Sequence, residues 1–149
     1  MAVTTAEAIA RVRERLNAGS YTFPLYFNGD DAAILPDTPA PFGFVVFNNE
    51  GALAVSYGGG RGNNVYRNRG RVEVFVFSPM GYGAETVAAY AETVATQLRS
   101  FRDDVISCFG ADVIPIGPGS TMSVPGFASD VSNYQCALVE AVVTFDLTG

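Results

Sequence analysis

The chain has 149 residues, of which 48% are hydrophobic and 12% aromatic, and its formal net charge is −6. This content can bury the core of one domain and excludes a disordered chain. No apolar run approaches the roughly 20 residues of a membrane-spanning helix, and the N-terminus lacks the pattern of a secretory signal. The sequence therefore predicts one soluble domain over residues 1–149, with no membrane partner.

The residue types that are missing exclude several kinds of catalysis. The chain has no histidine, and all nine basic residues are arginine. Imidazole acid–base catalysis, lysine Schiff bases and a P-loop lysine are therefore excluded. The two cysteines, Cys108 and Cys136, have apolar neighbours in the sequence, so we expect reduced, buried thiols.

The N-terminal third predicts a helix, a short strand and a long loop. Thr4 and Glu7 have the spacing of a capping box, and the apolar residues that follow have helical periodicity, so we expect a helix at 5–18. Residues 22–28 form a short aromatic run interrupted by proline, which is typical of an edge strand. The segment 29–41, rich in Asp and Pro, predicts a loop.

The middle of the chain predicts a hairpin, a flexible loop and a central strand. Two β-type runs at 42–48 and 52–57 flank Asn49-Glu50-Gly51, which favours a tight turn. The glycine-rich residues 58–64 predict a mobile connection. Residues 71–78 are apolar on both faces beyond Glu73, which is typical of a central strand.

The remaining chain predicts a long helix at 84–101, short strands at 105–108 and 113–116, a loop at 117–127 and a long strand at 134–147. This order favours an α+β fold. We expect a mixed, mainly antiparallel sheet, with the N-terminal helix and one long helix packed on one face.

Charge is unevenly distributed along the chain. The segment Gly58–Arg71 contains four arginines and no acid, whereas the other five arginines and the fifteen acids leave −10 on the rest of the chain. The pattern predicts an acidic body with one basic, flexible loop. A general nucleic-acid binder would instead have a broad basic face.

None of the candidate chemical motifs is complete. Asp30, Asp31 and Asp37 could bind Mg²⁺ or Ca²⁺, but they lack EF-hand spacing and are equally suited to turns and helix caps. Asp103-Asp104 at the end of the long helix opposes the helix dipole, so either a solvated turn or a neighbouring subunit's arginine is expected there. The sequence predicts no enzyme, catalytic residue, cofactor or metal site; an unusual carboxylate-only hydrolase stays open as an alternative.

The arginine cluster is the strongest functional candidate. Arg71 and Glu73 share a strand face and could pair with each other, whereas Arg61, Arg67 and Arg69 have no acid nearby in the sequence. Two interpretations remain open: a solvated loop, or a loop that docks on an acidic surface such as that of another copy.

The segment Arg69–Gly83 (RGRVEVFVFSPMGYG), which leads into an Ala-rich helix, resembles a family of small phage proteins. This family is the tail-terminator or tail-completion group of long-tailed phages, similar to the lambda gpU-like proteins. Residues 24–28 and 41–45, and Pro125-Gly126-Phe127 before the last strand, resemble its early and C-terminal motifs. The glycine-rich insertion at 58–64 departs from the family pattern.

The resemblance implies a structural virion protein without enzymatic activity. Copies would form a hexameric ring that caps the major tail tube protein, stops its polymerisation and joins the tail to a head-completion or stopper protein. DNA would pass through the lumen without specific binding. The location would be the neck region of a phage tail or gene-transfer particle, assembled in the bacterial host cytoplasm.

Three loops are the predicted contact surfaces, at 30–41, 58–69 and 117–124, because loops of this length and composition usually have a function or are disordered. The candidate subunit or partner interface residues in or beside them are Asp31, Asp37, Arg61, Asn63, Arg67, Arg69, Ser120 and Met122. Another neck protein, a head–tail connector or stopper, is the alternative function.

Overall fold

The computed structural model describes residues 4–30, 38–54, 60, 62–119 and 131–148. In this part of the chain, two helices and six strands follow one another in the order α1 (Thr5–Asn17), β1 (Leu25–Phe27), β2 (Phe42–Ala54), β3 (Val65–Pro79), α2 (Ala84–Leu98), β4 (Phe101–Arg102), β5 (Ser107–Pro118) and β6 (Tyr134–Thr148).

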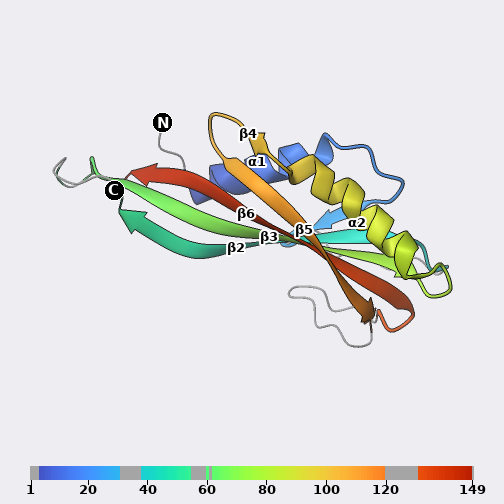
Figure 1. The fold of residues 1–149 in the computed structure, drawn as a ribbon. Helices are drawn as coiled ribbons and strands as arrows, with labels where there is room; N and C mark the ends of the chain where they lie inside the picture. The colour runs from blue at the N-terminus through green and yellow to red at the C-terminus, as the bar shows by residue number, and fades with distance from the viewer. Residues whose placement is uncertain (1–3, 31–37, 55–59, 61, 120–130, 149) are drawn as a thin grey trace.

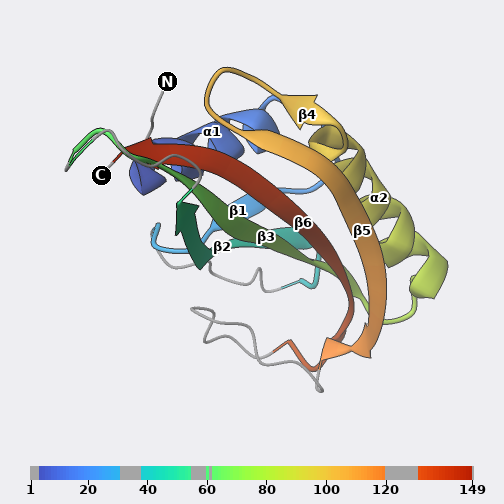
Figure 2. The same cartoon turned by 60° about the vertical axis from the view of Figure 1, so that its left-hand side comes forward.

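The six strands form one sheet in the order β1-β2-β3-β6-β5-β4. Strand β1 runs parallel to β2, and all other pairs are antiparallel. The predicted α+β fold with a mixed, mainly antiparallel sheet is confirmed. Figures 1 and 2 show that the long strands curve and that α1 and α2 lie on the same side of the sheet.

Helix α1 begins with the predicted capping box. The Glu7 N–H donates to the Thr4 hydroxyl, 3.1 Å away, and the Thr4 N–H donates to the Glu7 carboxylate, 2.6 Å away. Two otherwise unsatisfied N–H groups are thereby paired, which fixes the start of the helix. Its apolar face buries Val12 and Leu16.

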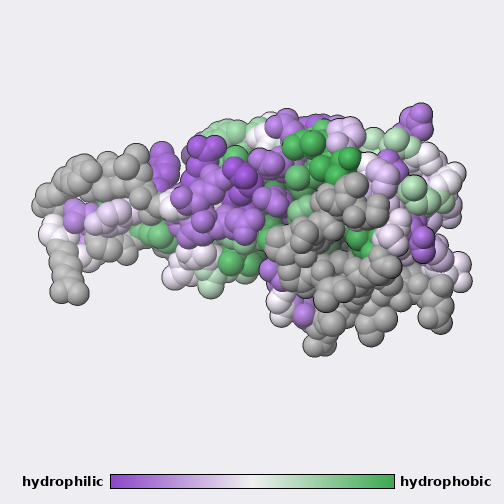
Figure 3. All heavy atoms as spheres, turned by 90° about the horizontal axis from the view of Figure 1, so that it is seen from below, coloured by the Kyte–Doolittle hydropathy of each residue, from purple (hydrophilic) through white to green (hydrophobic). Residues whose placement is uncertain are grey.

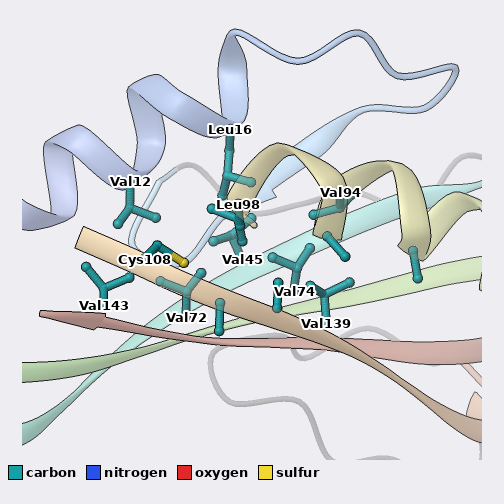
Figure 4. Packing of buried hydrophobic residues seen from close by; sticks show 14 of the residues in the cluster. Val12, Leu16, Val45, Val72, Val74, Val94, Leu98, Cys108, Val139 and Val143 are labelled. Atoms are coloured by element: carbon teal, nitrogen blue, oxygen red, sulfur yellow. The ribbon is translucent and has the colours of Figure 1, made fainter. Parts of the chain in front are cut away.

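The main core lies between the sheet and the two helices. On β3, the side chains of Val72, Val74 and Val76 point into this core and are fully buried. Figure 4 shows Leu16 of α1 pointing toward Leu98 of α2, above these strands. Because alternate residues of a strand point to opposite faces, the odd-numbered residues of β3 lie on the other side of the sheet.

That second side, which we call the helix-free face, has its own apolar cluster. The Phe42 and Phe77 rings are stacked with centroids 4.8 Å apart, and Tyr134 packs edge-on against both. Both faces of β3 are therefore apolar at this end, which agrees with its predicted central position.

The predicted hairpin turn at Asn49-Glu50-Gly51 is wrong. Strand β2 continues through these residues, and the pairing with β3 passes from Asn49↔Gly70 to Gly51↔Arg69, so Glu50 is the extra residue of a β-bulge. Gly51 has φ +114°, and its N–H donates to the Asn49 side-chain oxygen. Glycine suits this kind of bulge as well as a tight hairpin turn, because it adopts a positive φ readily in either one.

Other predicted boundaries also need correction. Strand β3 begins at Val65, so the basic segment does not form a loop up to Arg71. Helix α2 ends at Leu98, because Ser100 has φ 54° and Phe101 pairs with Cys108 in the sheet. The two short strands near 105–108 and 113–116 are one strand, β5, with two bulges.

Within the part of the chain that the structure describes, none of the helices has the length and apolar character needed to cross a membrane.

Candidate interaction surface

The helix-free face is divided into an apolar end and a charged end. The aromatic cluster described above occupies the apolar end. The charged end lies on the C-terminal half of β2, the N-terminal part of β3, the C-terminal part of β6 and the adjoining part of β5. Figure 3 shows a hydrophilic patch beside an apolar area on this face. We call it the charged patch; its residues are Asn48, Glu50, Arg67, Arg69, Arg71, Glu73, Asp112, Glu140 and Asp146.

Glu50 is the centre of the charged patch. Its carboxylate lies 3.2 Å from the Arg69 Nε and 2.6 Å from an Arg71 terminal nitrogen. Arg71 Nε also lies 3.5 Å from Glu140, at a geometry that makes an ion pair but no hydrogen bond. The bulge in β2 thus places one carboxylate where two arginines of β3 can share it.

Arg67 and Asp146 form a second ion pair directly across β3 and β6. Arg67 donates two hydrogen bonds to the Asp146 carboxylate, at 2.9 and 3.1 Å, in the planar geometry that guanidinium and carboxylate share. The hydrogen bonds from Arg67 lower the pKa of Asp146 below its usual range. This pair therefore stabilises the fold at neutral pH, and the contribution is lost as the pH falls through the lowered pKa.

Three carboxylates form a row across the same face. In the strand register Glu73 is opposite Glu140, and Glu140 is opposite Asp112. Like charges directly opposite each other in a sheet are destabilising. Arg71 beside Glu140 and the Asn48 amide, 3.5 Å from Glu73, offset part of this repulsion.

Of the predicted interface residues, the structure brings Arg67 and Arg69 together on this face. They have no acid nearby in the sequence, but strand pairing brings Asp146 beside Arg67 and Glu50 beside Arg69. Asn63 is exposed in the turn before β3, where its N–H donates to the Gly60 carbonyl. The remaining candidates lie outside the described residues: Asp31, Asp37, Arg61, Ser120 and Met122.

Sequence reasoning missed the acidic partners of these arginines. Arg71 pairs with Glu50 and Glu140. Although Arg71 and Glu73 share a strand face, no ion pair joins them in the described part of the chain. Only the register between β3 and β6 could have pointed to Glu140 and Asp146, and a single sequence does not supply that register.

The other acidic candidates have partners within the chain. Asp30 accepts a hydrogen bond of 2.9 Å from Arg13. The Asp103 carboxylate accepts the N–H groups of Val105 and Ile106, and Arg11 lies 3.8 Å from it, so no arginine of a neighbouring subunit is needed there. Among the described residues, no group of three or more Cys, Asp or Glu side chains is arranged to hold a metal ion.

Both cysteines are free and buried, as predicted. Burial raises the pKa of the Cys108 thiol from 9.0 to about 11 and that of Cys136 to about 12. The thiolate, which is the reactive form, is therefore scarce at neutral pH.

We expect neither cysteine to react with a thiol reagent at pH 8 in the folded protein, and both to react after unfolding. The folded-state pKa values are raised, so their contribution to stability is complete below pH 9 and decreases as the pH rises toward 12. Labelling followed by mass measurement, with and without denaturant, checks this. Rapid labelling of folded protein at pH 8 would show that a thiol is accessible.

An open cleft of about 560 Å³ lies where β5 diverges from the end of β6. The last pair near this end joins Ser107 to Thr144, so β6 continues beyond β5 toward Asp146. Arg102, Phe109 and Asp146 are among the lining residues. The cleft is therefore bordered by a sheet edge, one exposed aromatic ring and charges of both signs.

Comparison with known proteins adds no assignment: no protein-family model matches the sequence, and no curated protein matches it.

Proposed function

We propose that this chain is a structural subunit of a ring that terminates the tail tube of a phage or phage-like particle. The resemblance implies sixfold symmetry for this ring. Copies pack side by side around a central channel. On one side the ring stops the polymerisation of the tail tube protein, and on the other it binds a head-completion protein. The proposed role is structural and requires no catalytic residue.

The arrangement of the sheet is the observation that carries this proposal. Both helices cover one face, whereas the other face carries the charged patch. The two sheet edges are also different, since β1 and β2 lie at one and β4 and β5 at the other. A ring subunit needs two different lateral surfaces, because a head-to-tail contact joins unlike surfaces and closes when the rotation is right.

The row of Glu73, Glu140 and Asp112 suits the inner wall of such a ring. Carboxylates repel the phosphates of a passing DNA, so the DNA is not retained. Five acids and three arginines lie in the charged patch, which keeps its net charge negative even with the ion pairs formed. In this arrangement the helix-free face points to the lumen and the helices point outward.

Electron microscopy of particles assembled without this chain tests the proposal. Overlong tail tubes are expected, because nothing then stops the tube protein from polymerising, and restoring the chain returns the normal length. Tails of normal length that lack heads would contradict a terminator and indicate a head–tail connector or stopper instead. Complete, infectious particles would contradict both functions.

A further inference from the structure

We propose that copies of this chain join by edge-to-edge strand pairing, in which β1 of one copy pairs antiparallel with residues 113–115 of β5 in the next copy. This inference rests on the proposed ring and assigns the two sheet edges that build it. The register that we infer places Phe27 opposite Val113, Tyr26 opposite Ile114 and Leu25 opposite Pro115.

Both strands have an outer side with no strand beside it in the described part of the chain. Strand β1 is the first in the sheet order, and β4 covers β5 only at Ser107 and Cys108. The N–H and C=O groups along such an edge can pair with a strand of another chain. The regular stretch of β5 is short, because bulges precede Ala111 and follow Pro115. Strand β1, with three residues, is short enough to pair within it.

The odd-numbered residues of β1 direct their backbone groups away from β2. The Asn28 N–H donates to the Val45 carbonyl of β2, 2.9 Å away. Because successive residues of a strand alternate in the side to which their N–H and C=O groups point, Tyr26 faces β2 in the same way, and Leu25 and Phe27 face outward.

The odd-numbered residues of β5 also face outward. The Ala111 carbonyl accepts a hydrogen bond of 2.9 Å from Arg99 Nε, which lies at the end of α2 and not on β6. Pro115 has no N–H, and a proline in an edge strand belongs where the missing N–H would face away from the ladder. Val113 lies between these two residues, so its N–H and C=O both point outward and can exchange hydrogen bonds with Phe27 of a second copy.

The two edges lie at the same level of the sheet. The paired residues lead across it from Phe27 through Val45, Val74 and Val139 to Val113. Strand β1 runs in the direction of β2 and opposite to β5, so a neighbouring copy placed beside β5 forms an antiparallel pair. Figure 2 shows β1 and β5 separated by the width of the sheet. A head-to-tail contact at one level needs no axial step and therefore closes into a ring rather than a helix.

The side chains match on both faces of the sheet. Leu25, Phe27 and Val113 all pack against the main core, on the helix side. Tyr26 packs against the aromatic cluster of the helix-free face, and Ile114 lies on that face by alternation. The side chain of Ile114 is 39% exposed in one copy, and Tyr26 of the next copy lies opposite it in this register. A shift by one residue would put these side chains on the wrong faces, so the register is specific.

This match favours a second copy as the partner. The paired residues carry no charge, so the pairing removes no ion from water. The direction, the level and the facing of both strands are those that one copy presents to the next when all helices lie on the same side of the ring.

An engineered disulfide tests the register. Tyr26 and Ile114 would form a non-hydrogen-bonded antiparallel pair, with Cα atoms about 4.5 Å apart, which a disulfide can bridge. Mild oxidation of the double variant Tyr26→Cys with Ile114→Cys is expected to give a ladder of covalent multimers up to the closed ring, since both native thiols are buried. Each single variant should give monomers only, and a mixture of the two should give dimers only. Dimers from Tyr26→Cys alone would indicate a two-fold contact and overturn the proposal.

Tyr26→Cys with Phe109→Cys is the matched control. Phe109 lies on the same strand as Ile114, five residues away or about 16 Å along it. Its side chain is 72% exposed, so accessibility alone predicts more cross-linking for the control than for the test pair. The proposed register predicts none. A ladder from the control, or no ladder from the test pair in a sample that forms rings, would overturn the register.

Amide hydrogen exchange of the unmodified chain tests the same contact without any substitution. The N–H groups of Leu25, Phe27 and Val113 should exchange at least roughly ten-fold more slowly in rings than in monomers, because each gains a carbonyl partner. The Asp112 N–H faces β6 and is the internal control, protected in both states. Equal exchange of the three amides in rings and monomers would overturn the edge pairing.

These outcomes separate the inference from the proposed function. Rings without the cross-link and without the added protection overturn the edge pairing and leave the ring intact. Unmodified chains that stay monomeric, alone and with tail tubes present, overturn the ring and the pairing together. Rings that show the pairing but do not stop the growth of tail tubes overturn the proposed function and leave the pairing in place.

Discussion

Replacing Phe77 with alanine is expected to lower the free energy of unfolding by roughly 3–5 kcal/mol. The side chain is fully buried on the helix-free face, stacked on Phe42 with ring centroids 4.8 Å apart and edge-on to Tyr134 at 6.3 Å. Its removal leaves a cavity among aromatic rings that cannot close without moving β2. Chemical denaturation of the purified protein measures the change.

Phe109→Ala is the control for that experiment, because the same chemical change is made at a side chain that is 72% exposed. It should change the unfolding free energy of the monomer by less than about 0.5 kcal/mol. If both substitutions had equal effects, the aromatic cluster would not be the second core described above.

Replacing Gly70 with valine is expected to cost about 1–3 kcal/mol of stability, because it overpacks the helix side of β3. A Cβ atom added at Gly70 would lie 2.4 Å from the Phe47 Cζ, well inside van der Waals contact. The Phe47 ring covers the glycine across the strand pair, so the ring must move and lose part of its packing. Thermal or chemical unfolding measures the loss.

A double-mutant cycle shows whether this clash is the cause. Phe47→Ala removes the ring, so Gly70→Val should cost clearly less in that background than in the unmodified protein. Additive effects of the two substitutions would mean that Gly70 is needed for another reason.

Local sequence patterns predicted much of the fold. The capping box at Thr4 and Glu7 gave the start of α1, and alternation along residues 134–147 gave β6 with its buried face. The central position of β3 also followed from its two apolar faces. These features depend on residues close together in the chain, where sequence spacing and spatial spacing agree.

The β-bulges could not be distinguished from turns. Asn49-Glu50-Gly51 favours a positive φ in either case, and only the long antiparallel pairing with β3 decides that β2 continues. The same applies to β5, where bulges split one strand into two short runs. The exposed position of Phe109, in the first of these bulges, was therefore not predicted.

The candidate site was predicted only in part. The arginines at 67 and 69 were expected in a basic loop, whereas the structure places them on a strand and in ion pairs. Their partners are distant in sequence, since Asp146 lies 79 residues from Arg67. Such pairs depend on strand register, which one sequence does not reveal.

The central claim is that copies of this chain pack side by side into a closed ring. Native mass measurement of the full chain, alone and after release from tail tubes, tests it most directly. The expected result is one dominant species whose mass is a fixed whole-number multiple of 15.8 kDa, with six copies predicted by the resemblance. A single-chain mass of 15.8 kDa under both conditions, at every concentration, would contradict the claim.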